Sequence, residues 1–321
     1  MLSFSEYLGE AKKQVKVTRT QTTKRAPSPA IRAFATKVID HFDDPDSYDG
    51  GPYIRLLQHY KDLMYDDINT LLRGGTVEGY TKPEGMSSDK YINMLGGAAK
   101  MISRVFAYSK LPAPLTVYRG CNMVSFFGMP KTDPSLIAAL NTIKEMHARH
   151  RENIHYVQTA VHPDESEKYS TKDIIASRAK AGERPLPVPK DAAQRAQDIL
   201  VAQHDIIRTW AHSPLTLRGF TSTTWDINIA TNFAFNRDEM SQAVLLKITI
   251  PTGMNAFVMG EGTHSRLEKF VGGEGEVLLP HGTVIAPESG SEWLLDSVEY
   301  VHTPHYLIPV IPAKVVRTPV S

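Results

Sequence analysis

The apolar residues of this chain follow one period in its first part and another in its last third. Between residues 31 and 106, three segments repeat apolar residues at the three- and four-residue spacing of amphipathic helices. Beyond residue 213, short apolar runs bounded by glycine and proline predict strands instead. These runs are residues 217–223, 243–250, 256–259, 276–279, 284–285 and 306–310. The pattern predicts helices first and a β-rich last third, with one earlier strand at 115–118.

The chain divides into a short N-terminal segment and one large domain. Residues 1–30 are interpreted as a short helix and a flexible basic linker, because residues 12–25 place Lys and Arg among Thr and Gln. Such a linker could tether the chain to a particle, but a solvated tail is the favoured interpretation. The domain at 31–321 is expected to contain a helical cap at 31–110, an insertion at 131–212 that ends in a helix, and a β-rich core at 213–315.

Composition excludes several classes of protein. The chain carries 36 basic and 35 acidic side chains, a formal charge of +1, which argues against a nucleic-acid binder that works through bulk charge. Cys121 is the single cysteine, so an intrachain disulfide and a multi-cysteine metal site are excluded. The histidines lack cysteine partners and a His-Glu-x-x-His pattern, so no metal site is expected. We expect Cys121 to be a buried, unreactive thiol in a reducing compartment.

Neither a secretion signal nor a membrane span is expected. Glu6 and Glu10 interrupt the N-terminal apolar residues, where a signal peptide needs a continuous apolar core. No stretch approaches the roughly 18 apolar residues that can span a bilayer. The sequence therefore predicts a soluble chain.

Three short segments carry residues suited to chemistry. Arg119 ends a predicted strand before Gly120, so its guanidinium could bind a phosphate while the glycine admits a ligand close to the backbone. The Ser-Thr-Thr run at 222–224 supplies hydroxyls that can orient a carboxylate. Glu274 and Glu276 would face opposite sides of a regular strand, but the glycines beside them permit a turn or bulge that brings both to one site.

In this order, the three segments resemble the R-S-E class of mono-ADP-ribosyltransferases, of the arginine-specific type. That class has a strand-end Arg, a Ser-Thr-Ser/Thr strand and a Glu-x-Glu behind a loop. The run YKDLMYDDINTLLRGG at 60–75 resembles its helical cap, and the resemblance extends over residues 31–312. It implies an α+β fold with two small crossed β-sheets around an NAD cleft, N-terminal helices and a helical insertion. The chain departs from the family in the longer 131–212 region and in Thr224, where many members have a second Ser.

The resemblance implies NAD as the substrate, held without a metal, and a role for each motif residue. Arg119 would contact the phosphates and ribose of NAD, and Gly120 the nicotinamide amide. Ser222 would hold Glu276, which would stabilise the oxocarbenium-like charge as nicotinamide leaves. Glu274 would orient or deprotonate the acceptor arginine. Further NAD contacts are implied at Tyr118, Thr223, Thr224, Phe233 and Arg237, although core packing explains Phe233 equally well.

Within this class, the chain is most similar to the Alt- and Mod-type enzymes of tailed bacteriophages. That similarity implies bacterial host proteins, such as RNA polymerase or translation proteins, as targets, action in the host cytoplasm, and packaging in the virion. Two alternatives stay open. One is an NAD glycohydrolase or a transferase with a non-arginine or nucleic-acid acceptor, and the other is a particle-bound binding or structural protein.

Overall fold

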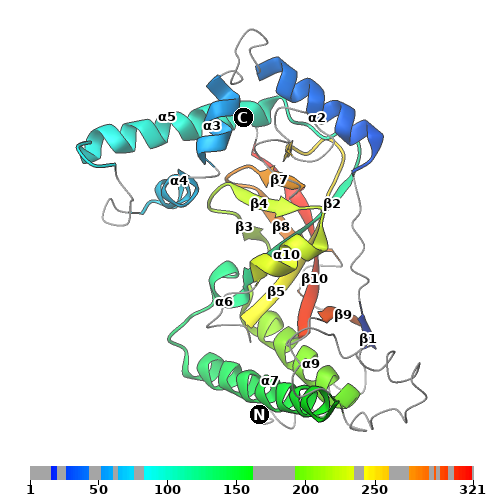
Figure 1. Cartoon of the computed structure of the whole chain (residues 1–321). Helices are drawn as coiled ribbons and strands as arrows, with labels where there is room; N and C mark the ends of the chain where they lie inside the picture. Colours follow the sequence, from blue (N-terminus) through cyan, green and yellow to red (C-terminus); the bar gives the residue numbers. More distant parts are fainter. Residues whose placement is uncertain are drawn as a thin grey trace.

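The computed structural model describes an α+β chain, as the sequence predicts (Figure 1). The described residues are 16–19, 27–42, 52–60, 64–75, 83–161, 192–234, 242–259, 275–288, 293, 297–302 and 307–319. The helices are α2 (Pro29–Phe42), α3 (Pro52–His59), α4 (Tyr65–Leu72), α5 (Ser88–Ala107), α6 (Met123–Phe126), α7 (Pro134–Val161), α9 (Ala192–Trp210) and α10 (Ile227–Ala234). The strands are β1 (Lys16–Arg19), β2 (Leu115–Asn122), β3 (Leu215–Thr216), β4 (Thr221–Thr224), β5 (Ala243–Ile250), β6 (Phe257–Val258), β7 (Glu276–Leu279), β8 (Val284–Pro287), β9 (Ser297–His302) and β10 (Leu307–Arg317).

The strands form one mixed sheet that has a narrow point in its middle. Its order is β1-β9-β10-β5-β2-β4-β7-β6, with β8 paired to β10 and β3 paired to β8. Strand β2 pairs with β5 along eight residues, from Leu115 to Asn122. It pairs with β4 only at Tyr118 and Thr224. The two small sheets expected from the family resemblance are therefore two halves of one hydrogen-bonded sheet that meet at a single residue pair.

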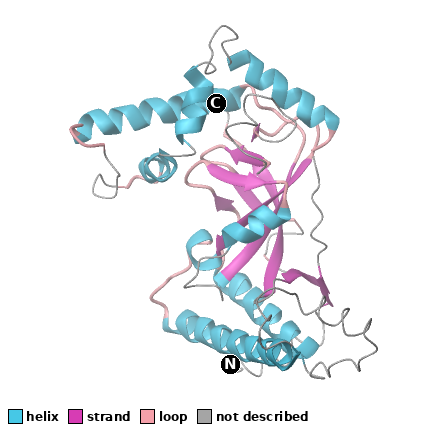
Figure 2. Cartoon of the chain, in the orientation of Figure 1, coloured by secondary structure: helices cyan, strands magenta, loops and turns pink. Residues whose placement is uncertain are grey.

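Helices lie at both ends of the strands (Figure 2). In Figure 1, α2, α3 and α5 lie at one end, and α7 and α9 lie at the other. Helix α5 begins after Ser87, whose hydroxyl accepts a hydrogen bond from the Lys90 N–H at 3.4 Å, the usual arrangement of a helix N-cap. The predicted cap helices and the predicted helix at the end of the insertion are thus present.

The cap helices bury an apolar core of their own against one half of the sheet. Ile68, Leu95 and Ile102 from the cap are at most 1% exposed. They pack in one cluster with Phe220, which precedes β4, and with Leu278 of β7. Each fully buried aliphatic side chain contributes roughly 1.5–3 kcal/mol, so this contact fixes the cap to the strands that carry the candidate site.

Part of the segment expected to be a flexible linker forms an edge strand. Lys16 to Arg19 pair in parallel with Ser297 to Tyr300 of β9. An edge strand offers a row of unpaired N–H and C=O groups, and an extended segment satisfies them whatever its apolar content. The interpretation of this short stretch as linker is therefore wrong, while the remaining residues of the segment before Pro27 lie outside the described ranges.

Among the described residues, no helix is long and apolar enough to cross a membrane.

Candidate active site

The three motif segments lie on three neighbouring strands. Arg119 belongs to β2, Ser222 to β4 and Glu276 to β7, and β4 lies between the other two. The Nη1 atom of Arg119 donates a hydrogen bond to the backbone carbonyl of Ser222. The Ser222 hydroxyl donates to Oε1 of Glu276 at 2.6 Å. The residues singled out from the sequence therefore form one hydrogen-bonded chain from guanidinium to carboxylate.

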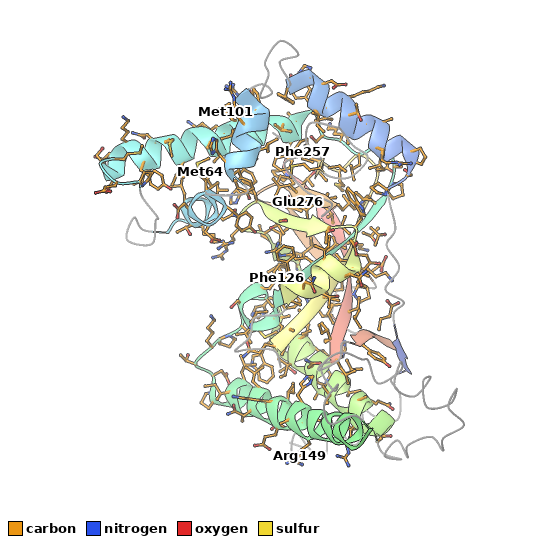
Figure 3. All side chains as sticks on the ribbon, viewed as in Figure 1. Met64, Met101, Phe126, Arg149, Phe257 and Glu276 are labelled. Carbon is orange, nitrogen blue, oxygen red and sulfur yellow. The ribbon has the colours of Figure 1, made fainter. Side chains whose placement is uncertain are left out.

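The carboxylate end of this chain is shielded from water. Glu276 is 7% exposed and pairs with Thr224 in the antiparallel ladder. Its backbone carbonyl accepts a hydrogen bond from the Met259 N–H at 2.7 Å. Figure 3 shows Glu276 on the strands just below the cap helices. A carboxylate fixed in this way can stabilise positive charge that develops beside it without first reorganising.

The guanidinium end lies beside an aromatic ring. The Cζ atom of Arg119 is 5.9 Å from the ring centroid of Phe126, which lies in the short helix α6. This distance is within the range of a cation–π contact. The Nε atom of Arg119 is buried and has no hydrogen-bond partner among the described residues. The guanidinium is therefore held on two sides, and its remaining N–H groups include the Nε–H, which has no acceptor among the described residues.

Packing between β2 and α10 requires a glycine at position 120. A Cβ at this position would overlap the carbonyl oxygen of Ala230 and the backbone nitrogen of Ala234, both in α10. Only glycine lets α10 pack this closely on β2. The nicotinamide contact that the family resemblance implies for Gly120 stays a prediction, and packing alone already requires a glycine here.

The other residues expected from β2 and β4 are largely buried. The Thr223 hydroxyl donates to the carbonyl of Val277 at 2.6 Å, and the Thr224 hydroxyl accepts from the Asp226 N–H at 3.0 Å. Tyr118 packs in a buried cluster with residues of α10 and β5, such as Ile227. These contacts hold the strands and the start of α10 together, and a contact of these residues with NAD stays a prediction.

Of the three remaining residues that were expected in the site, Phe233 lies within the described part of the chain. Phe233, in the last turn of α10, is 66% exposed, so core packing does not account for its ring. Glu274 and Arg237 lie outside the described residues. The ring of Phe233 is available for stacking, as the resemblance implies, and the other two roles stay predictions.

Two residues of the cap border the site and were not identified from the sequence. Tyr60 is 2% exposed, and its hydroxyl accepts a hydrogen bond from the Asn69 side-chain amide at 3.3 Å. Burial raises the pKa of Tyr60 well above its usual range, and the charges of Tyr65 and Glu276 raise that pKa further, while Arg119 lowers it. Tyr60 is therefore close enough to the carboxylate and the guanidinium to interact electrostatically with both.

The side chain of Asn69 explains why residue 219 is a glycine. A Cβ on Gly219 would lie 2.5 Å from Oδ1 of Asn69. Both Tyr60 and Asn69 belong to the run at 60–75 that the sequence analysis assigned to the cap. The polar side chain of Asn69, next to the apolar Ile68 within this run, was a signal that could have marked it for closer attention.

Cys121 and the histidines add no reactive group that the structure supports. Burial raises the pKa of the Cys121 thiol to about 12, so the thiol stays protonated at neutral pH, as expected from the sequence. Within the described ranges, no three His, Cys, Asp or Glu side chains are grouped to hold a metal ion.

A family model matches one part of the chain. A model of the ADP-ribosyltransferase exoenzyme family matches residues 54–178, which include Arg119 but neither Ser222 nor Glu276. No curated protein matches the chain.

Several solved structures resemble the chain at low identity. C3stau2 from S. aureus, solved with NAD, is 15% identical, with a TM-score of 0.46 over 94% of this chain and 100% of that one. Plx2a, an ADP-ribosyltransferase toxin from Paenibacillus larvae, is 15% identical, with a TM-score of 0.43 over 97% of both chains. The ADP-ribosylating toxin BECa of C. perfringens, solved with NADH, is 14% identical, with a TM-score of 0.44 over 89% of this chain. The chain spans only 46% of BECa.

Proposed function

We propose that this chain is a mono-ADP-ribosyltransferase that moves ADP-ribose from NAD to arginine side chains of proteins. The hydrogen-bonded chain from Arg119 through Ser222 to Glu276 carries the proposal. A structural role alone gives no reason to hold a carboxylate, 7% exposed, on a serine hydroxyl beside a guanidinium. The family model that matches residues 54–178 supports the same assignment.

The residues divide the reaction between them. Arg119 binds the phosphates of NAD through the N–H groups that its contact with Ser222 leaves available. Glu276 faces the nicotinamide ribose and stabilises the positive charge on C1′ as the bond to nicotinamide breaks. The acceptor nitrogen then bonds to C1′, its proton leaves to a base, and nicotinamide departs with the electron pair of the broken bond.

The choice of acceptor depends on the second glutamate. A charged guanidinium is a poor nucleophile, so an arginine acceptor needs a nearby carboxylate to orient it and take its proton. Glu274 stands two residues before Glu276 and is the residue we propose for this role. Water would take the place of arginine if Glu274 did not act, and the chain would then be an NAD glycohydrolase.

We propose further that the targets are bacterial host proteins, RNA polymerase and translation proteins being the first to examine. The reaction would then take place in the host cytoplasm, with the chain delivered from a bacteriophage virion. This proposal rests on the resemblance of the N-terminal residues to phage enzymes. It is tested by probing purified virions of a host phage with an antibody raised against the chain. Absence of the chain from virions would limit its action to protein made after infection.

The test of the enzymatic proposal uses labelled NAD, a bacterial lysate and three variants of the purified chain. Glu276→Gln should abolish both labelling of proteins and release of nicotinamide, because the charge that stabilises C1′ is gone. Glu274→Ala should lose labelling and keep part of the nicotinamide release. The control is Glu145→Ala, an exposed carboxylate in α7 with a side chain 69% exposed, which should behave as wild type.

The chemistry of the labelled bond decides the acceptor. Labelled bands that neutral hydroxylamine removes identify arginine-linked ADP-ribose. Free ADP-ribose without bands would replace the transferase with a glycohydrolase. No NAD turnover by the wild-type chain would refute an enzymatic role and leave the alternative of a binding protein.

A further inference from the structure

The helical cap contains a buried carboxylate that belongs to none of the three motifs. Asp67 lies in the first turn of α4 and is 3% exposed. Its Oδ2 atom accepts a hydrogen bond of 2.5 Å from the hydroxyl of Tyr91, which lies near the start of α5 and is 2% exposed. Burying a charge costs much free energy, and buried polar pairs are a weak source of stability. The pair therefore calls for a role other than stabilising the cap.

Three consecutive buried residues of α4 contact three different parts of the cap. Ile68 is fully buried in the cap core. Successive side chains of an α-helix are about 100° apart, so Asp67 and Asn69 lie on either side of Ile68. Asp67 is bonded to α5, which lies beside α4 (Figure 1), whereas Asn69 donates a hydrogen bond of 3.3 Å to the hydroxyl of Tyr60. Rotation of α4 about its axis would break both bonds and leave buried polar groups unpaired, so the two bonds fix that rotation.

The rotation of α4 determines where Asn69 and Tyr60 lie at the border of the candidate site. Oδ1 of Asn69 fits against Gly219, where a Cβ would lie only 2.5 Å from it. The Tyr60 hydroxyl that Asn69 holds lies within electrostatic range of Glu276 and Arg119. Tyr60 is 2% exposed and Glu276 is 7% exposed, so both are shielded from water. A contact between two cap helices is thus linked, through Asn69, to the surroundings of Glu276.

We propose that the hydrogen bond between Asp67 and Tyr91 fixes the rotation of α4, and that α4, through Asn69, holds Tyr60 beside Glu276 for the release of nicotinamide. This inference rests on the proposed function. Displacement of Tyr60 admits water to Glu276, and water weakens the interaction of the carboxylate with the charge that develops on C1′. Asp67 and Tyr91 are positioning residues, since they act on Glu276 through Asn69 and Tyr60.

The first variant removes only the hydroxyl of Tyr91. Tyr91→Phe should lower kcat for nicotinamide release by about 3- to 30-fold, within the range of couplings between residues that share contacts. KM for NAD should change by less than about twofold, because Arg119 keeps its contacts with the Ser222 carbonyl and the Phe126 ring. A purely structural role would lower the melting temperature and leave kcat unchanged well below it.

A double-mutant cycle tests whether the effect passes through Asn69. Asn69→Ala removes the link between α4 and Tyr60, so Tyr91→Phe should lower kcat by less than about twofold when it is added to Asn69→Ala. Independent effects would instead multiply, and Tyr91→Phe would then cause the same loss in both backgrounds. That result would overturn the proposed path from α5 to the site.

A second double variant separates stability from positioning. Tyr91→Phe leaves the buried charge of Asp67 with one hydrogen-bond donor fewer, which lowers the melting temperature. Asp67→Asn/Tyr91→Phe removes that charge, so the melting temperature should rise again, whereas kcat should stay low because the bond between α4 and α5 is still absent. Recovery of kcat together with the melting temperature would overturn the inference. This double variant also replaces Tyr91→Phe if the single variant does not fold.

Ser109→Ala is the matched control for Tyr91→Phe. Ser109 is fully buried just after α5, and its hydroxyl donates a hydrogen bond of 2.7 Å to the carbonyl of Val105 within the same helix. The variant therefore removes a buried hydroxyl next to α5 without breaking the bond to α4, and it should keep the wild-type kcat.

The outcomes separate this inference from the proposed function. If wild-type protein does not turn over NAD, the proposed function fails and the inference fails with it. If wild-type protein releases nicotinamide and Tyr91→Phe keeps the wild-type kcat, the inference alone is wrong. A loss of kcat in Ser109→Ala as large as that in Tyr91→Phe would also overturn it, because any buried hydroxyl near α5 would then have the same effect.

Discussion

Removing the hydroxyl that holds Glu276 tests whether the candidate site works as one unit. Ser222→Ala deletes the donor of the 2.6 Å hydrogen bond to Oε1 and leaves the strand backbone unchanged. A hydrogen bond to a charged group contributes about 1.5–3 kcal/mol. Each 1.4 kcal/mol corresponds to about a factor of ten in rate, so the variant should release nicotinamide about 10- to 150-fold more slowly. The upper end applies because Glu276 is only 7% exposed, so water replaces the lost bond poorly.

The assay follows nicotinamide release by chromatography over a range of NAD concentrations. The loss should appear mainly in kcat, because Ser222 acts on the carboxylate that stabilises the transition state. KM should change less, because the hydrogen bond that Arg119 donates goes to the backbone carbonyl of Ser222, which alanine retains.

Ser109→Ala provides the matched control for this experiment. Ser109 is fully buried, and its hydroxyl likewise donates a short hydrogen bond, of 2.7 Å, but to the backbone carbonyl of Val105 at the end of α5. The control should lose about 1 kcal/mol of stability and keep wild-type kcat. If Ser222→Ala keeps kcat within about twofold of wild type, or raises KM as much as it lowers kcat, the reasoning is refuted.

Three further predictions concern other parts of the structure. Burial raises the pKa of Asp205 to about 6 in the folded state, so the stability it contributes below pH 4 is lost as the pH rises toward 6. Asp205→Asn should remove this slope and raise the free energy of unfolding above pH 6 by at most about 3 kcal/mol. The gain should be smaller than this limit, because the variant also loses the ion pair of Asp205 with the partly exposed Arg208 at 3.4 Å. Urea titrations at several pH values measure the change. The Cys121 thiol should react with a disulfide reagent at pH 8 at least about tenfold more slowly in the native than in the unfolded chain, because its pKa is about 12. Phe126→Ala should raise KM for NAD about two- to fivefold, because the ring contact with Arg119 is worth about 0.5–1 kcal/mol, and an unchanged KM would exclude that contact from binding.

The sequence could predict the core of the candidate site because each motif is a local pattern at a strand end. Arg119, Ser222 and Glu276 stand beside glycines or in short β-branched runs, and strand pairing then brings them together. Their hydrogen bonds join residues 103 and 54 positions apart in the chain. Such distances are not encoded in any local pattern, so only the resemblance to a family indicated that the three segments meet.

Other contacts in the structure could not be predicted from a local sequence pattern. Tyr60 reaches the site because the cap packs on β4 and β7, and a tyrosine within a helical period is otherwise read as a core residue. Strand β1 was missed because edge pairing depends on the backbone of β9 and not on an apolar pattern in residues 16–19. The sequence analysis interpreted Gly275 as a residue that permits a turn between the two glutamates. The structure shows a second reason for glycine at this position, because a Cβ there would lie 2.6 Å from Nε1 of Trp225.

The narrow point of the sheet explains why the site lies where it does. Pairing of Tyr118 with Thr224 would place Gly120 opposite Ser222 if the antiparallel ladder continued, but the ladder stops after that single pair. The carbonyl of Ser222 then lacks a backbone partner from β2, and the Arg119 side chain supplies the hydrogen bond instead. The divergence of the two strands thus makes room for a guanidinium and also gives it a fixed acceptor. A longer β2–β4 ladder would be more regular, but the backbone of β2 would then bond the Ser222 carbonyl, and Arg119 would lose the acceptor that holds its guanidinium.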